Sequence, residues 1–178
     1  MDAQTLSAVS FTGHRPEKLP TGNFLHMVQS LLYAEIAEAI SQGARTFYTG
    51  AARGVDLWAA DIVLSFRQKH PDLRLVCAVP FPEHGAGLTG AERYHLQTVL
   101  HAADERVTVS PAYARDCFRR RNRYLVEHCQ RLIAVVADMQ SGTGQTIRLA
   151  EKQGIDIRLI TVGRAAEQLH PSNSFYQF

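Results

Sequence analysis

Long apolar runs are missing from this sequence, as are the cysteine and histidine spacings that build disulfide frameworks and metal sites. No run approaches the roughly 20 residues of a membrane-spanning helix, and residues 1–7 show no basic region followed by an apolar stretch. The three cysteines (Cys77, Cys117 and Cys129) are odd in number, and the 8 histidines are scattered. We therefore expect a cytoplasmic protein with no membrane partner, no signal peptide, no bound metal ion and no cofactor.

An excess of charge of one sign is missing too. The chain has 19 Lys and Arg against 17 Asp and Glu, and a net charge of +2 is too small to indicate a nucleic-acid binder by itself. The apolar share of 46% and the charged share of 20% are typical of a folded domain, and 178 residues fit one domain without repeats or a linker. Any electrostatic function must come from where the charges cluster.

Apolar segments of β character alternate with segments of helical period. The expected strands are residues 8–12, 46–49, 73–79, 106–109, 132–137 and 157–161. The expected helices are residues 24–42, 55–66 and 91–103, a basic helix beginning at Pro111 or at Cys117, and a helix opened by residues 141–144. This alternation predicts a three-layer Rossmann-like α/β fold with a mainly parallel sheet. We expect one domain over residues 1–178, with a polar tail from about residue 164.

Three strand-to-helix loops carry residues that the fold alone does not require. In a parallel α/β sheet such loops lie at the carboxyl edge, where ligands bind. The first loop contains Gly13, His14 and Arg15: glycine permits a sharp turn, and the arginine offers a donor fork suited to phosphate or carboxylate. An ordinary turn with a solvated arginine is the alternative.

The second loop contains Gly50, Arg53, Gly54 and Asp56. Its small residues allow close approach of a ligand, and the helix that follows offers free amides to an anion. Its spacing matches neither a Walker A loop nor a GxGxxG fingerprint. Asp56 could instead simply favour the N-terminus of its helix.

The third loop is Ser141, Gly142, Thr143 and Gly144, which suits a phosphate cradle or an ordinary helix N-cap. Glu83, in the loop after the third strand, is the remaining carboxylate that we expect at this edge; an exposed loop acid is the alternative.

A run of arginines forms the fourth candidate element. On a helix, Arg115, Arg119 and Arg123 share one face, and Glu127 continues the stripe. A solvated helix face is the alternative. If the helix begins near Cys117, Arg119 to Asn122 lie at the ligand edge, where an anionic partner would relieve their repulsion from the helix dipole.

The segments Phe11-Thr-Gly-His-Arg-Pro, Thr49-Gly-Ala-Ala-Arg-Gly-Val-Asp-Leu-Trp-Ala-Ala and Pro80-Phe-Pro-Glu resemble the YpsA-like proteins of the SLOG superfamily. The resemblance covers roughly residues 8–161. It implies a bacterial Rossmann-like domain of unassigned activity that binds a nucleotide or nucleotide-derived ligand. Homodimerisation is a further expectation, because related domains assemble.

Two more distant families share parts of this pattern. DNA-processing protein A, which binds single-stranded DNA, is echoed by Arg121-Asn122-Arg123, by the loop from Gly50 to Asp56, and by Ser141-Gly142-Thr143. That likeness implies ligand contacts at the following positions: Gly50, Arg53, Gly54, Asp56, Arg121, Asn122, Ser141 and Gly142. The LOG phosphoribohydrolases have a Pro-Gly-Gly-x-Gly-Thr-x-x-Glu loop. Here its leading residues are absent and Arg148 stands in place of the glutamate, which argues against carrying over the hydrolysis.

No independent catalytic set emerges from the residues, and no serine lies in a nucleophile elbow. The leading hypothesis is a sensor or carrier that binds a nucleotide-like small molecule by its phosphate. One alternative is a hydrolase of an N-glycosidic or phosphoester bond in a nucleotide, using Glu83 or Asp56. The other is a single-stranded nucleic-acid binder that uses the stripe from Arg115 to Arg123.

Overall fold

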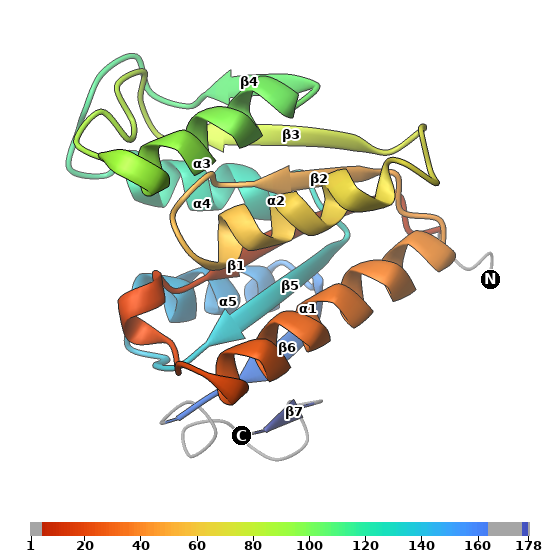
Figure 1. The fold of residues 1–178 in the computed structure, drawn as a ribbon. Coiled ribbons are helices and arrows are strands. Elements are labelled where there is room, and N and C mark those ends of the chain that lie inside the picture. The colour runs from red at the N-terminus through yellow and green to blue at the C-terminus, as the bar shows by residue number, and fades with distance from the viewer. Residues whose placement is uncertain (1–4, 164–175, 178) are drawn as a thin grey trace.

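The computed structural model describes residues 5–163 and 176–177, and the chain alternates strands with helices throughout (Figure 1). The elements are β1 (Ala8–Gly13), the 3-10 helix η1 (Pro16–Lys18), α1 (Asn23–Ser41), β2 (Thr46–Thr49), α2 (Val55–Phe66), β3 (Arg74–Val79), α3 (Gly90–Ala102), β4 (Glu105–Thr108), α4 (Cys117–Glu127), β5 (Arg131–Val136), α5 (Gly142–Lys152), β6 (Asp156–Thr161) and β7 (Tyr176–Gln177).

The strands form one sheet in the order β4-β3-β2-β1-β5-β6-β7, and every pairing between them is parallel. The chain winds outward from β1 to β4, then returns to place β5 beside β1, with Thr12 paired to Ala134 and Gly13 to Val135. The strand order therefore reverses between β1 and β5. In open α/β sheets, ligands bind in the crevice at the carboxyl ends of the strands at such a switch point.

Helices cover both faces of the sheet (Figure 1). Helices α1, α2 and α3 pack side by side on one face, and α4 and α5 pack together on the other. The larger core lies under α1 to α3 and includes Phe11 and Phe47, whose rings stack 6.0 Å apart. The expected three-layer Rossmann-like fold is confirmed. None of the helices in the described residues is long and apolar enough to cross a membrane.

The apolar periodicity explains the helix faces. In α1 the buried positions Val28, Leu32, Ile36 and Ala39 follow the i, i+4 spacing of one inward face. Gly43, with a φ of 108°, ends that helix in a conformation that glycine tolerates.

The structure decides where α4 begins and adds a seventh strand to the sheet. Of the two expected starts of the basic helix, the structure has the later one, Cys117, so Arg115 precedes α4 and does not share its face with Arg119 and Arg123. Strand β7, which pairs with β6, was not expected from the sequence. The expected polar tail from residue 164 falls, apart from Tyr176 and Gln177, outside the described residues.

Gly13 allows β1 to approach α2 closely, and this contact tests the fold. A Cβ on Gly13 would lie 2.4 Å from Val55 side-chain atoms, whereas a Cβ on Gly142 would meet nothing within 4 Å. We predict that Gly13→Ala lowers the free energy of unfolding by about 1–3 kcal/mol through overpacking. Gly142→Ala, the matched control, should change it by less than about 1 kcal/mol. Urea denaturation measures both, and equal stabilities would contradict the close packing.

Candidate anion-binding site

A pocket of about 340 Å³ opens at the carboxyl ends of β1 and β5, where the strand order reverses. We call it the site pocket. Its walls come from the β1–α1 loop, the β2–α2 loop, α4 and the start of α5. The lining residues are Phe11, Thr12, Gly13, His14, Arg15, Glu17, Lys18, Ala52, Asp56, His84, Phe118, Arg121, Asn122, Leu125, Ser141, Gly142 and Thr143.

The N-terminus of α5 forms one wall of the site pocket. Ser141 is its N-cap: its hydroxyl accepts from the Gly144 amide (3.2 Å) and donates to the Asp138 carbonyl (2.5 Å). The amides of Gly142 and Thr143 have no acceptor among the described residues. Both residues line the pocket, and the positive end of the helix dipole favours an anion there.

A buried ion pair lies beneath the site pocket. Arg121 Nη1 lies 3.8 Å from Asp56 Oδ2 and donates to the Gly50 carbonyl, while its Nε donates to Asn122 Oδ1 at 2.8 Å. Asp56 Oδ2 also accepts from the Ala52 amide at 3.3 Å. Burial raises the pKa of Asp56 to about 6, which the charge of Arg121 and the Ala52 amide only partly oppose. Burial likewise lowers the pKa of Arg121.

Two exposed cations stand at the mouth of the site pocket. Arg15 and Lys18 line it, and neither forms an ion pair within the described part of the chain. The nearby Arg53 is engaged differently, because it contacts both Glu17 (3.0 Å) and Glu92 (2.6 Å). Arg53 thus links the β1–α1 loop, the β2–α2 loop and α3, and it neutralises the carboxylate at the pocket rim.

Two histidines line the site pocket. Burial lowers the pKa of His14, and its Nε2 accepts a hydrogen bond from the Asp138 amide at 3.4 Å. Burial also lowers the pKa of His84, whose Nε2 donates to the Ala51 carbonyl at 3.0 Å. Ala51 has a φ of 53°, which a residue with a side chain rarely adopts. His84 therefore helps to hold a strained turn beside the pocket.

A second hollow of about 400 Å³ continues from the site pocket along α4 and α5, and we call it the arginine groove. The two share Phe118, Asn122 and Gly142. Three arginines, Arg115, Arg119 and Arg123, line the groove without an ion pair to any described residue. The lining is completed by Gln145, Thr146 and Leu149.

An aromatic cluster borders the junction of the two hollows. The ring of Phe81 lies edge-on to Tyr113 (5.5 Å between centroids) and to Phe118 (6.1 Å), and His84 lies 6.4 Å from Phe118. Tyr113 is 66% exposed and Phe118 36% exposed. Exposed rings next to cations are the arrangement with which proteins stack a nucleobase while holding its phosphate.

The structure brings most of the expected site residues together. Those that line the site pocket are Gly13, His14, Arg15, Asp56, Arg121, Asn122, Ser141, Gly142 and Thr143. Arg119 lies in the arginine groove instead, although Asn122 lines both hollows. The placement of Gly13, Gly50 and Gly142 at one edge of the sheet agrees with the sequence analysis.

The other expected residues lie around the site pocket without lining it. Gly50 contacts Arg121, and Gly54 packs so closely that a Cβ would lie 2.5 Å from the His14 carbonyl oxygen. Gly144 packs against the Met139 backbone in the same way. Arg53 is held by two carboxylates, and Glu83 is exposed and lies outside the pocket lining.

Sequence reasoning missed three titratable residues of the pocket lining: Glu17, Lys18 and His84. His84 follows Glu83 directly, and the side chain that reaches the pocket is the histidine. Lys18 lies on η1, a single turn with no apolar period to reveal it. Among the described residues, no group of three or more His, Cys, Asp or Glu side chains could hold a metal ion.

Fold and site together define a Rossmann-like α/β protein with a cation-lined pocket at its topological switch point. A family model, YpsA, described as the YspA SLOG family, matches residues 9–164, and the chain belongs to this family. It is 28% identical over 169 residues to the UPF0398 protein BH1768 of Halalkalibacterium halodurans, covering 88% of each chain. It is 24% identical over 156 residues to a UPF0398 protein of Bacillus thuringiensis, covering 84% of this chain and 85% of the relative.

Solved structures of DNA processing protein A share the fold. The Helicobacter pylori protein, whose structure was described for its single-stranded DNA binding mode, gives a TM-score of 0.57 at 21% identity over 89% of this chain. The Streptococcus pneumoniae protein gives a TM-score of 0.57 at 15% identity over 88% of this chain. This chain spans 66% and 50% of the lengths of those two proteins, respectively.

The raised pKa of Asp56 predicts a specific dependence of stability on pH. A carboxyl whose pKa rises on folding, here from 3.8 to about 6, stabilises the fold below pH 4 and loses that contribution as the pH rises through 6. We predict that the free energy of unfolding of the wild type, minus that of Asp56→Asn, falls by about 2–3 kcal/mol between pH 4 and pH 7.

Urea unfolding at several pH values measures this difference. His14 and His84 titrate in the opposite sense, but they are common to both proteins, so their contribution cancels. Glu83→Gln, at an exposed loop carboxylate without an ion pair to any described residue, is the control and should give a nearly constant difference. A difference for Asp56→Asn that stays constant or grows with pH would contradict the raised pKa.

Proposed function

We propose that the protein binds a nucleotide or nucleotide-derived ligand by its phosphate in the site pocket, as a sensor or carrier. The observation that carries the proposal is the convergence of two free amides with the side chains of Arg15, Lys18 and Arg121 on one pocket. Free amides at a helix N-terminus suit phosphate oxygens, and arginine matches them with paired donors. A neutral or cationic ligand would leave the two amides and the side chains of Arg15 and Lys18 without an anionic partner.

The size and walls of the site pocket support a small phosphate ester. A volume of about 340 Å³ falls at the lower end of the range for small-molecule pockets, about 300–1,000 Å³. Phe11 and Leu125 give it apolar walls, and Phe118 offers an aromatic surface at the junction with the arginine groove. A nucleotide with its phosphate at the N-terminus of α5 and its base near Phe118 would therefore contact both the polar and the apolar surface of the pocket.

Single-stranded nucleic acid is the second candidate, and the arginine groove favours it. Three arginines without carboxylate partners line a hollow that continues from the site pocket, so successive phosphates of one strand could follow them. The likeness in fold to DNA processing protein A is compatible with this candidate. The net charge of +2 gives little long-range attraction to a polyanion, which ranks it second.

No observation favours the hydrolase alternative. Glu83 is exposed and outside the pocket lining, so it is poorly placed to act on a ligand bound there. The Asp56 carboxylate is 5% exposed and lies against Arg121 and the Ala52 amide. Its position suits support of the pocket floor better than proton transfer to a ligand.

One competition experiment tests both candidates. The probe is a short fluorescein-labelled oligodeoxythymidine, and the competitors are thymidine 5′-monophosphate and thymidine, which lacks the phosphate. If one phosphate is held, we expect the monophosphate to compete on equal terms with the unlabelled oligonucleotide, and thymidine to fail. The log–log salt slope should be about 0.7 in magnitude, and Arg15→Ala should weaken binding about tenfold.

Arg120→Ala is the matched control. Arg120 lies on α4 with Arg119 and Arg123, but it is paired with Asp116 at 2.8 Å and lines neither hollow. It should leave affinity unchanged. If the log–log salt slope of the wild type is about 2 in magnitude and drops in Arg119→Ala and Arg123→Ala, single-stranded nucleic acid would replace the nucleotide as the proposed ligand. Affinity that is indifferent to both Arg15→Ala and Arg119→Ala would reject both.

A further inference from the structure

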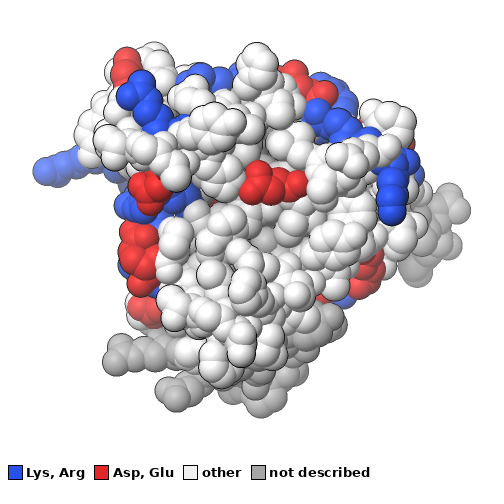
Figure 2. Space-filling model, in the orientation of Figure 1, with Lys and Arg blue, Asp and Glu red and all other residues white. Residues whose placement is uncertain are grey.

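The residues of the outer ridge of α1 are uncharged, although Glu38 flanks the ridge with a side chain that is 42% exposed and lies 3.6 Å from Arg158. The members of the ridge, spaced at i, i+3/i+4 and i+7, are Asn23, His26, Met27, Ser30, Ala34, Ala37 and Ser41. The outward face of a surface helix normally carries charged or polar residues. Neither α1 nor α2 contains a lysine or arginine, and Figure 2 shows the area over these two helices to be largely free of blue.

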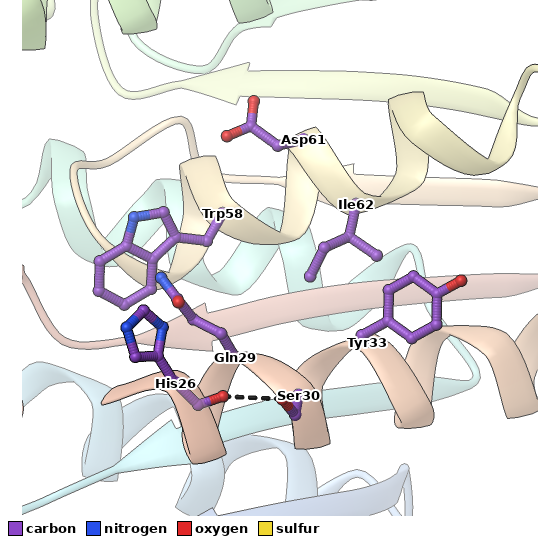
Figure 3. A pocket seen from close by; sticks show the side chains of 7 residues that line it. All are labelled: His26, Gln29, Ser30, Tyr33, Trp58, Asp61 and Ile62. Carbon is purple, nitrogen blue, oxygen red and sulfur yellow. Dashed lines mark hydrogen bonds between the residues drawn. The ribbon is translucent and has the colours of Figure 1, made fainter. Parts of the chain in front are cut away.

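A groove of about 500 Å³ runs beside this ridge, between α1 and α2. Trp58 and Ile62 of α2 point toward α1, where Gln29 and Tyr33 face them (Figure 3). Asp61 lies at the edge of the groove, points away from α1 (Figure 3), and is bonded to His95 at 2.7 Å. The interior of the groove is therefore uncharged.

Large exposed apolar side chains project from the same helix. Phe24 is 60% exposed, Met27 45% and Tyr33 49%, so three of the six large exposed apolar residues in the described part of the chain belong to α1. Met27 projects from the ridge, Tyr33 forms part of the groove wall, and Phe24 lines a separate hollow with Val28 and Val162, so exposed apolar side chains and a groove occur along one helix. A twofold interface needs this combination, because one patch must be complementary to itself.

We propose that this face binds a second copy of the chain, with the two α1 helices packed across a twofold axis between Ser30 and Ala34. A residue meets its own copy only near a twofold axis, and the ridge residues beside this axis, Ser30 and Ala34, are uncharged, so no like charges face each other there. Ser30, Ala34 and Ala37 are small enough for the two helices to approach closely. A nucleic-acid strand, by contrast, would find no cation on α1 or α2.

The length of α1 fits a standard interface. Nineteen residues at about 1.5 Å per residue make a helix about 28 Å long. A typical interface buries about 800 Å² on each partner, a patch roughly 30 Å across. Because α4 and α5 cover the opposite face of the sheet (Figure 1), dimerisation through α1 leaves both arginine grooves open.

Sedimentation equilibrium of the full chain over a range of concentrations tests the proposal. We expect the wild type to approach twice the monomer mass of 19.8 kDa, and Ala34→Arg to remain at the monomer mass with unchanged thermal unfolding. Ala112→Arg, at an exposed alanine in the loop before α4, is the matched control and should dimerise as the wild type does.

Cysteine cross-linking gives an independent measurement if Ala34→Arg fails to fold. Cys77, Cys117 and Cys129 are buried, so a short bismaleimide should link Ala34→Cys into a covalent dimer, and it should leave Ala112→Cys unlinked. A monomeric wild type at all concentrations would overturn the proposal. Dimers that persist in Ala34→Arg, or equal cross-linking of the two cysteine variants, would assign the interface to another face.

Discussion

The buried contact of Arg121 with Asp56 and the Gly50 carbonyl holds together two walls of the site pocket that come from opposite faces of the sheet. It ties α4, which covers one face, to the β2–α2 loop, which precedes a helix on the other face. A charge taken out of water must be paired, and removing one partner of a buried pair is strongly destabilising. With Arg121 held inward, Asn122 lies at the junction of the site pocket and the arginine groove.

Adjacent arginines on α4 consequently have different roles. Arg121 is buried and supports the pocket floor, and Arg120 is paired with Asp116. Arg119 and Arg123 face the groove and form no ion pair with any residue that the structure describes. Cations therefore gather beside α4 and α5, whereas α1 and α2 have none. This separation leaves one face of the molecule suited to an anionic ligand and the other to a protein surface.

Much of the fold follows from the sequence, because the switch between strand and helical period sets the elements and the parallel sheet brings their loops to one edge. The roles of single loop residues do not follow from it. The sequence indicates a turn at Gly13 and a phosphate cradle at Gly144, yet close contacts with Val55 and Met139 make both glycines packing positions. Arg53 bonds carboxylates that are distant in sequence, and His84 rather than Glu83 reaches the pocket. Such contacts depend on tertiary geometry that periodicity does not encode.

The central claim is that a phosphate binds at the N-terminus of α5. Amide NMR of the ¹⁵N-labelled full chain tests it most directly, with inorganic phosphate and a nucleoside 5′-monophosphate as separate titrants. The account predicts that both titrants shift the amides of Gly142 and Thr143 most, because these amides have no acceptor among the described residues and line the site pocket. Shifts confined to other segments, with the Gly142 and Thr143 amides unmoved at saturation, would contradict it.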